Sequence, residues 1–383
     1  MKKLPIVIVY FLFPVINIFA RNVGYAINRN WIDFVWGILF IFSLLMLLGK
    51  RLKLKVKRSF LVLSLIIIAW AFIHFFYNLV AGQTEIIPVF LEIKPFFYAL
   101  FALLWLKIWG MPTGNNFIDG GVILSLILML EFVLESFSVG YIVRIGGSGE
   151  INYDAMLLVM ATCFLIAQKG FWSKKIFYKW IIILVGLFVS LSRTALVTEI
   201  FLWFVFVNIN PVVKIGAIIF SVVGIFLSFS TRGLSFVFNN MDRYWMWMSA
   251  LTMFSTNPIQ FLLGFGVQPL PVDIPAQLAY LWIDLQQANW GLSGIYAYNF
   301  HAFWLRFAIS WGAIGVLLLL FLIIYLLISY RQSVVVMFLM IVFTLEGLTM
   351  GTIYLSNVGI PFILAVAVGV SDTRRKSLQA ERI

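Results

Sequence analysis

The sequence predicts an all-α polytopic membrane protein of about twelve transmembrane helices, and three observations lead to this fold class. Apolar residues make up 63% of the 383 residues and charged residues only 11%, whereas about a quarter of an average soluble domain is charged. Apolar runs that approach the length needed to cross a bilayer recur along the chain, and the mean hydropathy is +1.04. Lysines and arginines cluster between alternate runs, as cytoplasmic loops require.

Each predicted helix is an apolar run close to the 20 residues that cross a hydrocarbon core. Nine runs precede a long polar stretch and three follow it. We therefore divide the chain into transmembrane helices over 1–229, a periplasmic loop with short helices over 230–300, transmembrane helices over 301–370 and a cytoplasmic tail over 371–383. The predicted helices are residues 4–20, 31–49, 59–81, 88–109, 117–136, 152–168, 177–192, 194–209, 212–229, 301–329, 333–350 and 353–370.

The orientation follows from the basic residues in the short loops. Residues 50–58 carry six cations, and further cations lie in 169–179 and 374–382. Placing these runs in the cytoplasm puts both termini there as well. Contact with anionic membrane lipids explains the net charge of +12, so the charge gives no reason to expect a nucleic-acid partner.

Eight cations remain on the opposite face, and seven of them are arginine. Arginine grips phosphate through a planar fork, whereas lysine acts as a point charge. Because the orientation rule disfavours cations on that face, we expect a ligand there that needs them, and a diphosphate fits. The alternative is that these side chains reach outward to lipid headgroups. The eight are Arg21, Arg29, Lys94, Arg144, Arg193, Arg232, Arg243 and Arg306.

The long loop at 230–300 is the main interruption of the helices. A loop of this length in a compact protein is usually a lid or a binding loop. Within it, the segment 241–254 predicts a helix at the membrane surface, with aromatic side chains at the interface.

Two arginines stand out as ligand-binding candidates. Arg193 lies at the outer junction of two apolar runs, where a charge is costly unless it is paired or functional. Arg243 follows Asp242 and precedes Tyr244 and Trp247. These three neighbours suit contact with a sugar above a diphosphate, and the alternative is a local Asp–Arg surface pair of little consequence.

His301 is the candidate catalytic base. It opens the helix after the long loop, with Arg306 five residues on, and histidine exchanges a proton near neutral pH. The alternative is a satisfied core histidine, which is how we interpret His74. With two histidines and the single Cys163 in the chain, we predict neither a metal site nor a cofactor.

Several membrane acids remain unassigned by the sequence. Glu92 pairs with Lys94 or stands at the outer end of its helix, and Glu150 and Asp154 flank the outer start of the sixth helix. Each of them suits a proton relay or a contact to a substrate hydroxyl, and the sequence does not distinguish between these two roles.

Three segments together resemble the O-antigen polymerase and ligase family. They are a Ser-Arg pair at a helix start (Ser192-Arg193), a loop motif running from Arg243 through Asn257-Pro258 to Gly264-Phe265-Gly266, and a histidine (His301) followed by Gly312-Ala313-Ile314-Gly315. The family often has Asn directly after the histidine, and this chain has Ala302.

The resemblance implies an inverting, metal-independent glycosyltransferase with a GT-C-like membrane fold in the bacterial inner membrane. Its donor would be an oligosaccharide on undecaprenyl diphosphate, joined at a site facing the periplasm. The family roles carried over give the diphosphate to Arg193 and Arg243, with Arg306 nearby, and activation of the acceptor hydroxyl to His301. Fixed cations can replace a metal in stabilising such a leaving group.

Three functions stay open at this point. A polymerase, our first choice, would lengthen a glycan on a second lipid-linked repeat unit, with a possible chain-length regulator as partner. A ligase would transfer the glycan to lipid A-core. A flippase would move the lipid-linked sugar without joining it, although transporters usually show internal repeats and polar sites at the midplane.

Overall fold

The structure is a computed structural model that describes residues 1–23, 30–47, 58–148, 150–168, 173–206, 211–230, 242–272 and 294–380. Within these ranges the chain consists of helices and turns and contains no strand. The all-α fold class is therefore confirmed for the described part of the chain.

Every apolar run that the sequence predicts as a helix is helical in its described part. The first is one helical stretch of α1 (Leu4–Val7), a π-turn (Ile8–Leu12) and α2 (Phe13–Asn22). The next eight are α3 (Asn30–Leu47), α4 (Arg58–Val80), α5 (Ile86–Ile108), α6 (Gly114–Val139), α7 (Ile151–Ile166), α8 (Lys174–Ser190), α9 (Arg193–Phe206) and α10 (Pro211–Ser230). Then come α11 (Asp242–Thr256), α12 (Pro258–Leu263), η4 (Ala297–Asn299), α14 (Phe303–Ser329), α15 (Val334–Glu346), η5 (Thr352–Tyr354) and α16 (Ser356–Ala380).

Four helices of the described chain are long and apolar enough to cross a membrane. They are Leu4–Asn22, Ile86–Ile108, Gly114–Val139 and Phe303–Ser329. Six shorter apolar helices accompany them: Trp31–Leu47, Ser64–Val80, Ile151–Ile166, Ile215–Leu227, Val334–Glu346 and Ser356–Ser371. The count of twelve spans stays a prediction.

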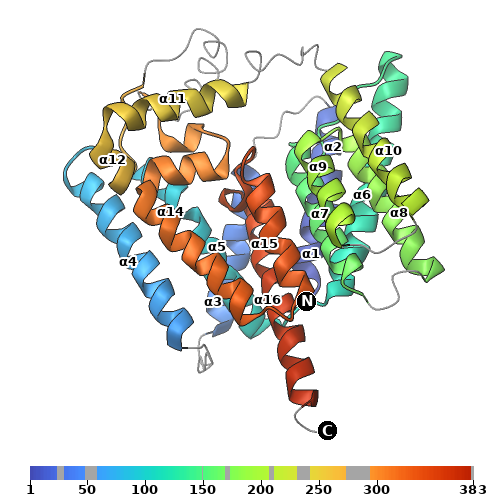
Figure 1. Ribbon diagram of the computed structural model, residues 1–383, viewed down its shortest axis with the longest axis horizontal. Coiled ribbons are helices and arrows are strands. Elements are labelled where there is room, and N and C mark those ends of the chain that lie inside the picture. The colour runs from blue at the N-terminus through green and yellow to red at the C-terminus, as the bar shows by residue number, and fades with distance from the viewer. Residues whose placement is uncertain are drawn as a thin grey trace.

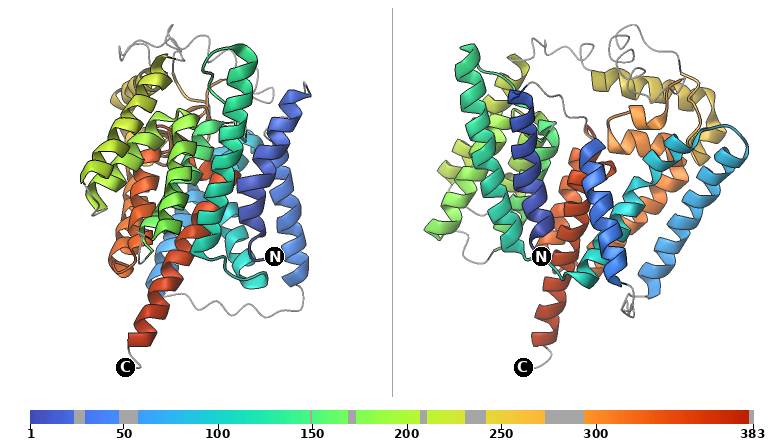
Figure 2. Two further views of the ribbon diagram at one scale, coloured as in Figure 1. Left: turned by 90° about the vertical axis from the view of Figure 1, so that its right-hand side faces the viewer. Right: turned by 180° about the vertical axis from the view of Figure 1, so that it is seen from behind.

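The long helices run side by side in a bundle, and both termini lie at one end of it (Figure 1). The last turns of α16 extend beyond the other helices at that end (Figure 2). At the opposite end α11 lies across the bundle rather than along it (Figure 1). Parts of the loop at 230–300 and of the basic runs lie outside the described residues, so their predicted sides of the membrane stay predictions.

Helix α7 is the centre of the main core, and its side chains from Ala155 to Leu165 are all buried. Small residues let its neighbours approach. A Cβ on Gly121 of α6 would lie 2.5 Å from the Cβ of Ala161, and one on Gly186 of α8 would lie 2.9 Å from the Cα of Ser125. Small residues at such positions are what close helix packing within a membrane requires.

A second, smaller hydrophobic cluster joins α11 to the first half of α14. Met246, Ala250 and Met253 of α11 are buried with Phe265, and with residues on either side of His301. These are Phe300, Ala302, Leu305 and Ile309. The cluster fixes the loop helix α11 against the start of α14.

Candidate functional site

The connection between α15 and α16, residues 347–355, brings together the predicted site segments. The backbone N–H groups at the start of α14 donate to it, from Phe303 to the Met350 carbonyl at 2.9 Å and from Trp304 to the Gly347 carbonyl at 3.2 Å. These bonds satisfy donors that a helix start leaves unpaired. This connecting loop therefore holds the segment that contains His301.

The start of α9 meets the same connecting loop. The hydroxyls of Thr194 and Thr349 are 2.7 Å apart and share a hydrogen bond. Arg193, the first residue of α9, is half-buried beside this contact. The chain reaches this position through a break after α8, where Leu191 takes a left-handed conformation with φ 50°. The predicted division of the two helices near Ser192 is thus confirmed.

Helix α7 supplies a third wall. A Cβ on Gly351 would lie 3.5 Å from the Tyr153 hydroxyl and 3.7 Å from the His301 carbonyl oxygen. Gly351 is therefore a point where the start of α7, the connecting loop and the His301 segment meet. The Arg193 and His301 segments border one loop, although nearly 110 residues separate them in the chain.

His301 is half-buried between two buried neighbours, Phe300 and Ala302. The helix begins two residues after it, at Phe303, so His301 belongs to the entry of α14 rather than to its first turn. Tyr298, on the same entry, is half-buried. Its burial, together with the nearby Tyr296, raises its pKa above the usual range.

Arg306 is almost fully buried and makes several contacts within the described structure. Its Nε donates to the Glu92 carboxylate at 2.8 Å and its Nη2 to the Leu91 carbonyl at 2.9 Å. The Cζ atom lies 3.6 Å from the centre of the Tyr354 ring. These contacts tie α14 to α5 and η5, and a role for Arg306 in diphosphate binding stays a prediction.

Glu92 and Lys94 do not pair with each other, contrary to one of the two sequence interpretations. Residues two apart on a helix face different directions. Glu92 pairs with Arg306, and Lys94 pairs with Asp33 of α3 at 2.5 Å. Tyr98 and Ser356 also donate to Asp33, so this polar group links α3, α5 and α16.

The predicted loop residues lie on α11. Tyr244 and Trp247 are half-buried, and the Tyr244 ring packs edge-on against Trp245, with centroids 5.3 Å apart. The side chains of Asp242 and Arg243 lie outside the described residues, although their backbone opens α11. Because α11 shares a buried cluster with Phe300 and Ala302, these residues lie on a helix that is packed against the His301 segment.

The other two unassigned acids lie at the start of α7, Glu150 just before its first residue and Asp154 in its first turn. Asp154 is buried and accepts from the backbone N–H of Ser148 at 2.7 Å and from its hydroxyl. Glu150 accepts from Asn152, whose side-chain oxygen in turn accepts from Arg144. These contacts shape the wall that carries Tyr153.

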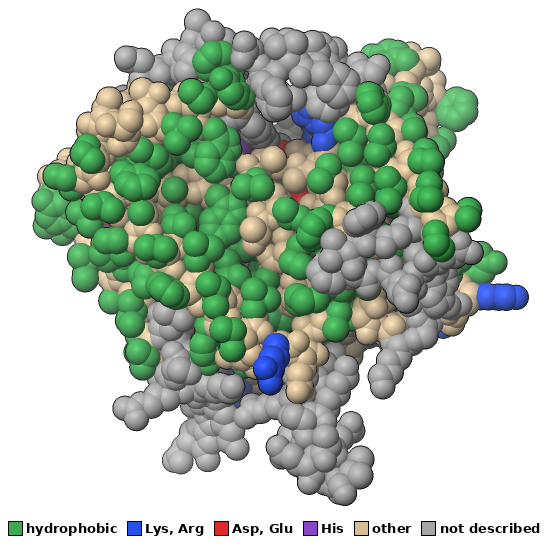
Figure 3. All heavy atoms as spheres, viewed as in Figure 1, with side chains coloured by type: hydrophobic (Ala, Val, Ile, Leu, Met, Phe, Trp, Pro, Cys, Tyr) green, Lys and Arg blue, Asp and Glu red, His purple; other side chains and the backbone are tan. Residues whose placement is uncertain are grey.

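The space-filling view shows a hollow between the α11–α14 side of the molecule and the α9–α10 side (Figure 3). Basic and acidic side chains are visible inside it, on a face that is otherwise mostly apolar. Such a polar hollow is the kind of place where charged groups in a membrane protein serve a ligand.

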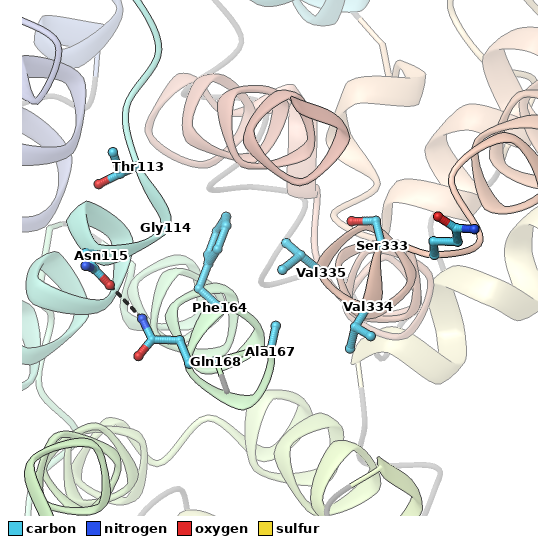
Figure 4. Close-up of a pocket in the computed structure, with 10 residues that line it drawn as sticks. Thr113, Gly114, Asn115, Phe164, Ala167, Gln168, Ser333, Val334 and Val335 are labelled. Atoms are coloured by element: carbon cyan, nitrogen blue, oxygen red, sulfur yellow. Dashed lines mark hydrogen bonds between the residues drawn. The ribbon is translucent and has the colours of Figure 1, made fainter. Parts of the chain in front are cut away.

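A separate cavity of about 250 Å³ lies at the other end of the bundle. It opens between the start of α6, the end of α7 and the start of α15, and its lining includes Thr113, Phe164, Gln168 and Ser333 (Figure 4). Gln168 donates to Asn115 across one side of it, at 2.6 Å. None of its ten lining residues is charged, so it does not suit a diphosphate.

Sequence reasoning missed the residues that assemble the site. Thr349, Gly351 and Tyr153 carry no recognisable motif, and their roles depend on contacts between distant segments. The one available signal was Thr194 directly after Arg193, because a hydroxyl at a helix start often makes a polar contact. Within the described ranges, no group of three or more His, Cys, Asp or Glu side chains is placed so that it could hold a metal ion.

Neither a family model, a curated protein nor a solved structure matches this chain.

Proposed function

We propose that the protein is a membrane glycosyltransferase that lengthens a surface polysaccharide. It would transfer a glycan from undecaprenyl diphosphate to a hydroxyl of a second lipid-linked repeat unit, at a site facing the periplasm of a bacterial inner membrane. The observation that carries the proposal is the connecting loop 347–355, which borders both the Arg193 segment and the His301 segment. The motif resemblance supplies the reaction.

The proposed step assigns one role to each group. The imidazole of His301 takes the proton of the acceptor hydroxyl as its oxygen attacks the anomeric carbon from the face opposite the diphosphate. The bond from that carbon to the phosphate oxygen breaks, and the diphosphate leaves with the electron pair. Arg193 and Arg243 stabilise the charge that develops on it. The anomeric configuration inverts.

The test uses purified protein in vesicles, supplied only with undecaprenyl diphosphate-linked repeat units. We expect longer glycans, separated by gel and weighed by mass spectrometry. Arg193→Ala and His301→Ala should each lower the rate about 100-fold or more, the range for losing a fixed charge or a general base. Arg331→Ala is the matched control, because Arg331 is exposed beside the start of α15, away from the connecting loop.

The outcomes separate the competing functions. Lengthening with lipid-linked repeat units alone supports the polymerase. Products that form only after lipid A-core is added indicate a ligase. Movement of the lipid-linked sugar across the bilayer without a new glycosidic bond indicates a transporter. Equal rates of glycan synthesis for the wild type and both site variants would show that the site is assigned wrongly.

A further inference from the structure

Helix α14 is broken at Gly312. This residue has φ 66° and ψ −177°, a conformation that only glycine adopts without strain. The break falls inside one of the four helices that are long and apolar enough to cross a membrane. A break in a helix frees backbone N–H and C=O groups, and such groups need hydrogen-bond partners wherever they are buried, as Ile309 and Ser310 are here.

A turn from the long loop supplies these partners. The backbone N–H of Phe265 donates to the Ile309 carbonyl at 2.7 Å, and that of Gly266 donates to the Ser310 carbonyl at 3.0 Å. The fit leaves no room for a side chain at Gly264 or at Gly312. A Cβ on Gly312 would lie 2.3 Å from the nitrogen of Gly264, and one on Gly264 would lie 2.4 Å from the Ser310 carbonyl oxygen.

Helix α4 and the turn after it hold the other side of the same segment. The Thr84 hydroxyl donates to the Val267 carbonyl at 2.6 Å. The Asn78 side-chain oxygen accepts from the Val267 N–H at 3.4 Å, and the Asn78 amide donates to Gln83 at 2.8 Å. A Cβ on Gly266 would meet the Asn78 oxygen at 1.9 Å. The turn is therefore clamped between α14 and α4.

We infer that the turn 264–267, the break at Gly312 and the side chains of Asn78 and Thr84 form a joint that positions α11, and with it Arg243, against His301. Only seven residues, Asn257 and the six of α12, separate the end of α11 from the turn. The same α11 shares a buried cluster with both neighbours of His301. Asn78 and Thr84 are thus positioning residues, and their effect on glycan synthesis rests on the proposed function.

The experiment measures the position of α11 directly and the activity separately. Spin labels are attached at Leu251→Cys, exposed on α11, and Phe321→Cys, exposed on α14 beyond the break, in a Cys163→Ala background. Double electron–electron resonance then gives the distribution of distances between the two spin labels, with the protein in lipid nanodiscs. The variants are Gly312→Ala, Asn78→Leu and the mild, nearly isosteric Thr84→Val. Gly37→Ala is the control, because a Cβ there meets nothing within 4 Å.

We expect Gly312→Ala and Asn78→Leu to shift or broaden the distance distribution and to lower glycan synthesis at least tenfold. Thr84→Val should give a smaller change of the same kind, and Gly37→Ala none. Unchanged distributions in all three variants would overturn the joint. A changed distribution with full activity would overturn the positioning role. If the wild-type protein makes no glycan, the proposed function is wrong. The distance measurement still tests the joint in that case.

Discussion

The Glu92–Arg306 pair places a charged contact in a part of the molecule that is largely closed to solvent. The Glu92 side chain is 1% exposed and that of Arg306 is 10% exposed. One carboxylate oxygen accepts from Arg306, and the other is buried with no hydrogen-bond partner among the described residues. Taking two charges out of water is expensive, so such a pair stabilises little by itself but is costly to break.

We predict that Arg306→Ala lowers stability more than Arg306→Ala combined with Glu92→Ala. The single variant leaves a buried carboxylate unpaired, at a cost of about 3–5 kcal/mol. The double variant removes that charge. The midpoint temperature of thermal unfolding in detergent measures this, with Lys94→Ala and its partner variant Asp33→Ala as a more exposed pair for comparison. Additive losses in the double variant would show that the two side chains are not coupled.

At this scale the sequence could name candidates but not partners. Glu92 and Arg306 are 214 residues apart, so no local spacing relates them, and the nearest cation in sequence, Lys94, faces another helix. Arg193 and His301 were chosen for their chemistry at helix starts. Both segments border the loop at 347–355 because Thr194 and Phe303 form hydrogen bonds with it. No sequence pattern predicts these bonds.

At the scale of elements, glycines decide how closely α6, α7 and α8 pack. Helices inside a membrane gain no hydrophobic driving force from one another, so close contact between small residues matters more. Gly121 faces Ala161, and Gly186 faces Ser125, so closely that a Cβ atom on either glycine would clash with its neighbour. These contacts set the place of α7, whose first turn carries Tyr153.

We predict that Gly121→Val separates α6 from α7 and destabilises the protein. Overpacking of this kind costs about 1–3 kcal/mol. Gly37→Val is the control, since a Cβ at Gly37 meets nothing within 4 Å. The measurement is again the midpoint of thermal unfolding in detergent. Equal midpoints for the two variants would contradict the packing described for Gly121.

The Thr194–Thr349 hydrogen bond gives a second prediction at this scale. Thr194→Val and Thr349→Val keep the side-chain shape and remove the contact, which is worth about 1 kcal/mol. We expect a small loss of stability and a larger loss of glycan synthesis, about three- to tenfold, because the start of α9 loosens from the connecting loop. Glycan synthesis and unfolding midpoints are measured on the same preparations. If glycan synthesis falls only as much as the loss of stability explains, the hydrogen bond has no separate role in placing Arg193.

The elements themselves were largely predictable. All twelve apolar runs are helices, because runs of this composition have few alternatives in a bilayer, and the loop segment 241–254 is a helix over 242–256. The break in α14 was not predicted. Residues 303–329 are apolar throughout, and Gly312 entered only as part of a motif. Its conformation follows from the turn at 264–267, which the sequence does not place beside it.

At the scale of the whole molecule, the two ends of the bundle differ in chemistry. The helices α7 and α15 each run from one end to the other. Their ends at Tyr153 and Glu346 adjoin the connecting loop, and their ends at Gln168 and Ser333 line the uncharged cavity. The proposed site and this cavity are therefore separated by the length of a helix.

We predict that single cysteines at Ser255 of α11 and at Gln332 label from opposite sides of the membrane. Both positions are exposed, and Cys163→Ala removes the only native cysteine. A membrane-impermeant maleimide is added to intact spheroplasts and to inverted vesicles, and labelled protein is counted by mass spectrometry. Spheroplasts should label Ser255→Cys, and inverted vesicles should label Gln332→Cys. Labelling of both from the same side would contradict this orientation.

The break at Gly312 also bears on how far the start of α14 stands above the hydrocarbon core. The roughly 17 residues below it, 313–329, measure about 26 Å at ~1.5 Å per residue, close to the thickness of a hydrocarbon core. If these residues span the hydrocarbon core, the half above the break, which ends near His301, projects into the layer of polar headgroups. A carrier whose tail stays among the acyl chains would bring its phosphates to that same level without leaving its leaflet.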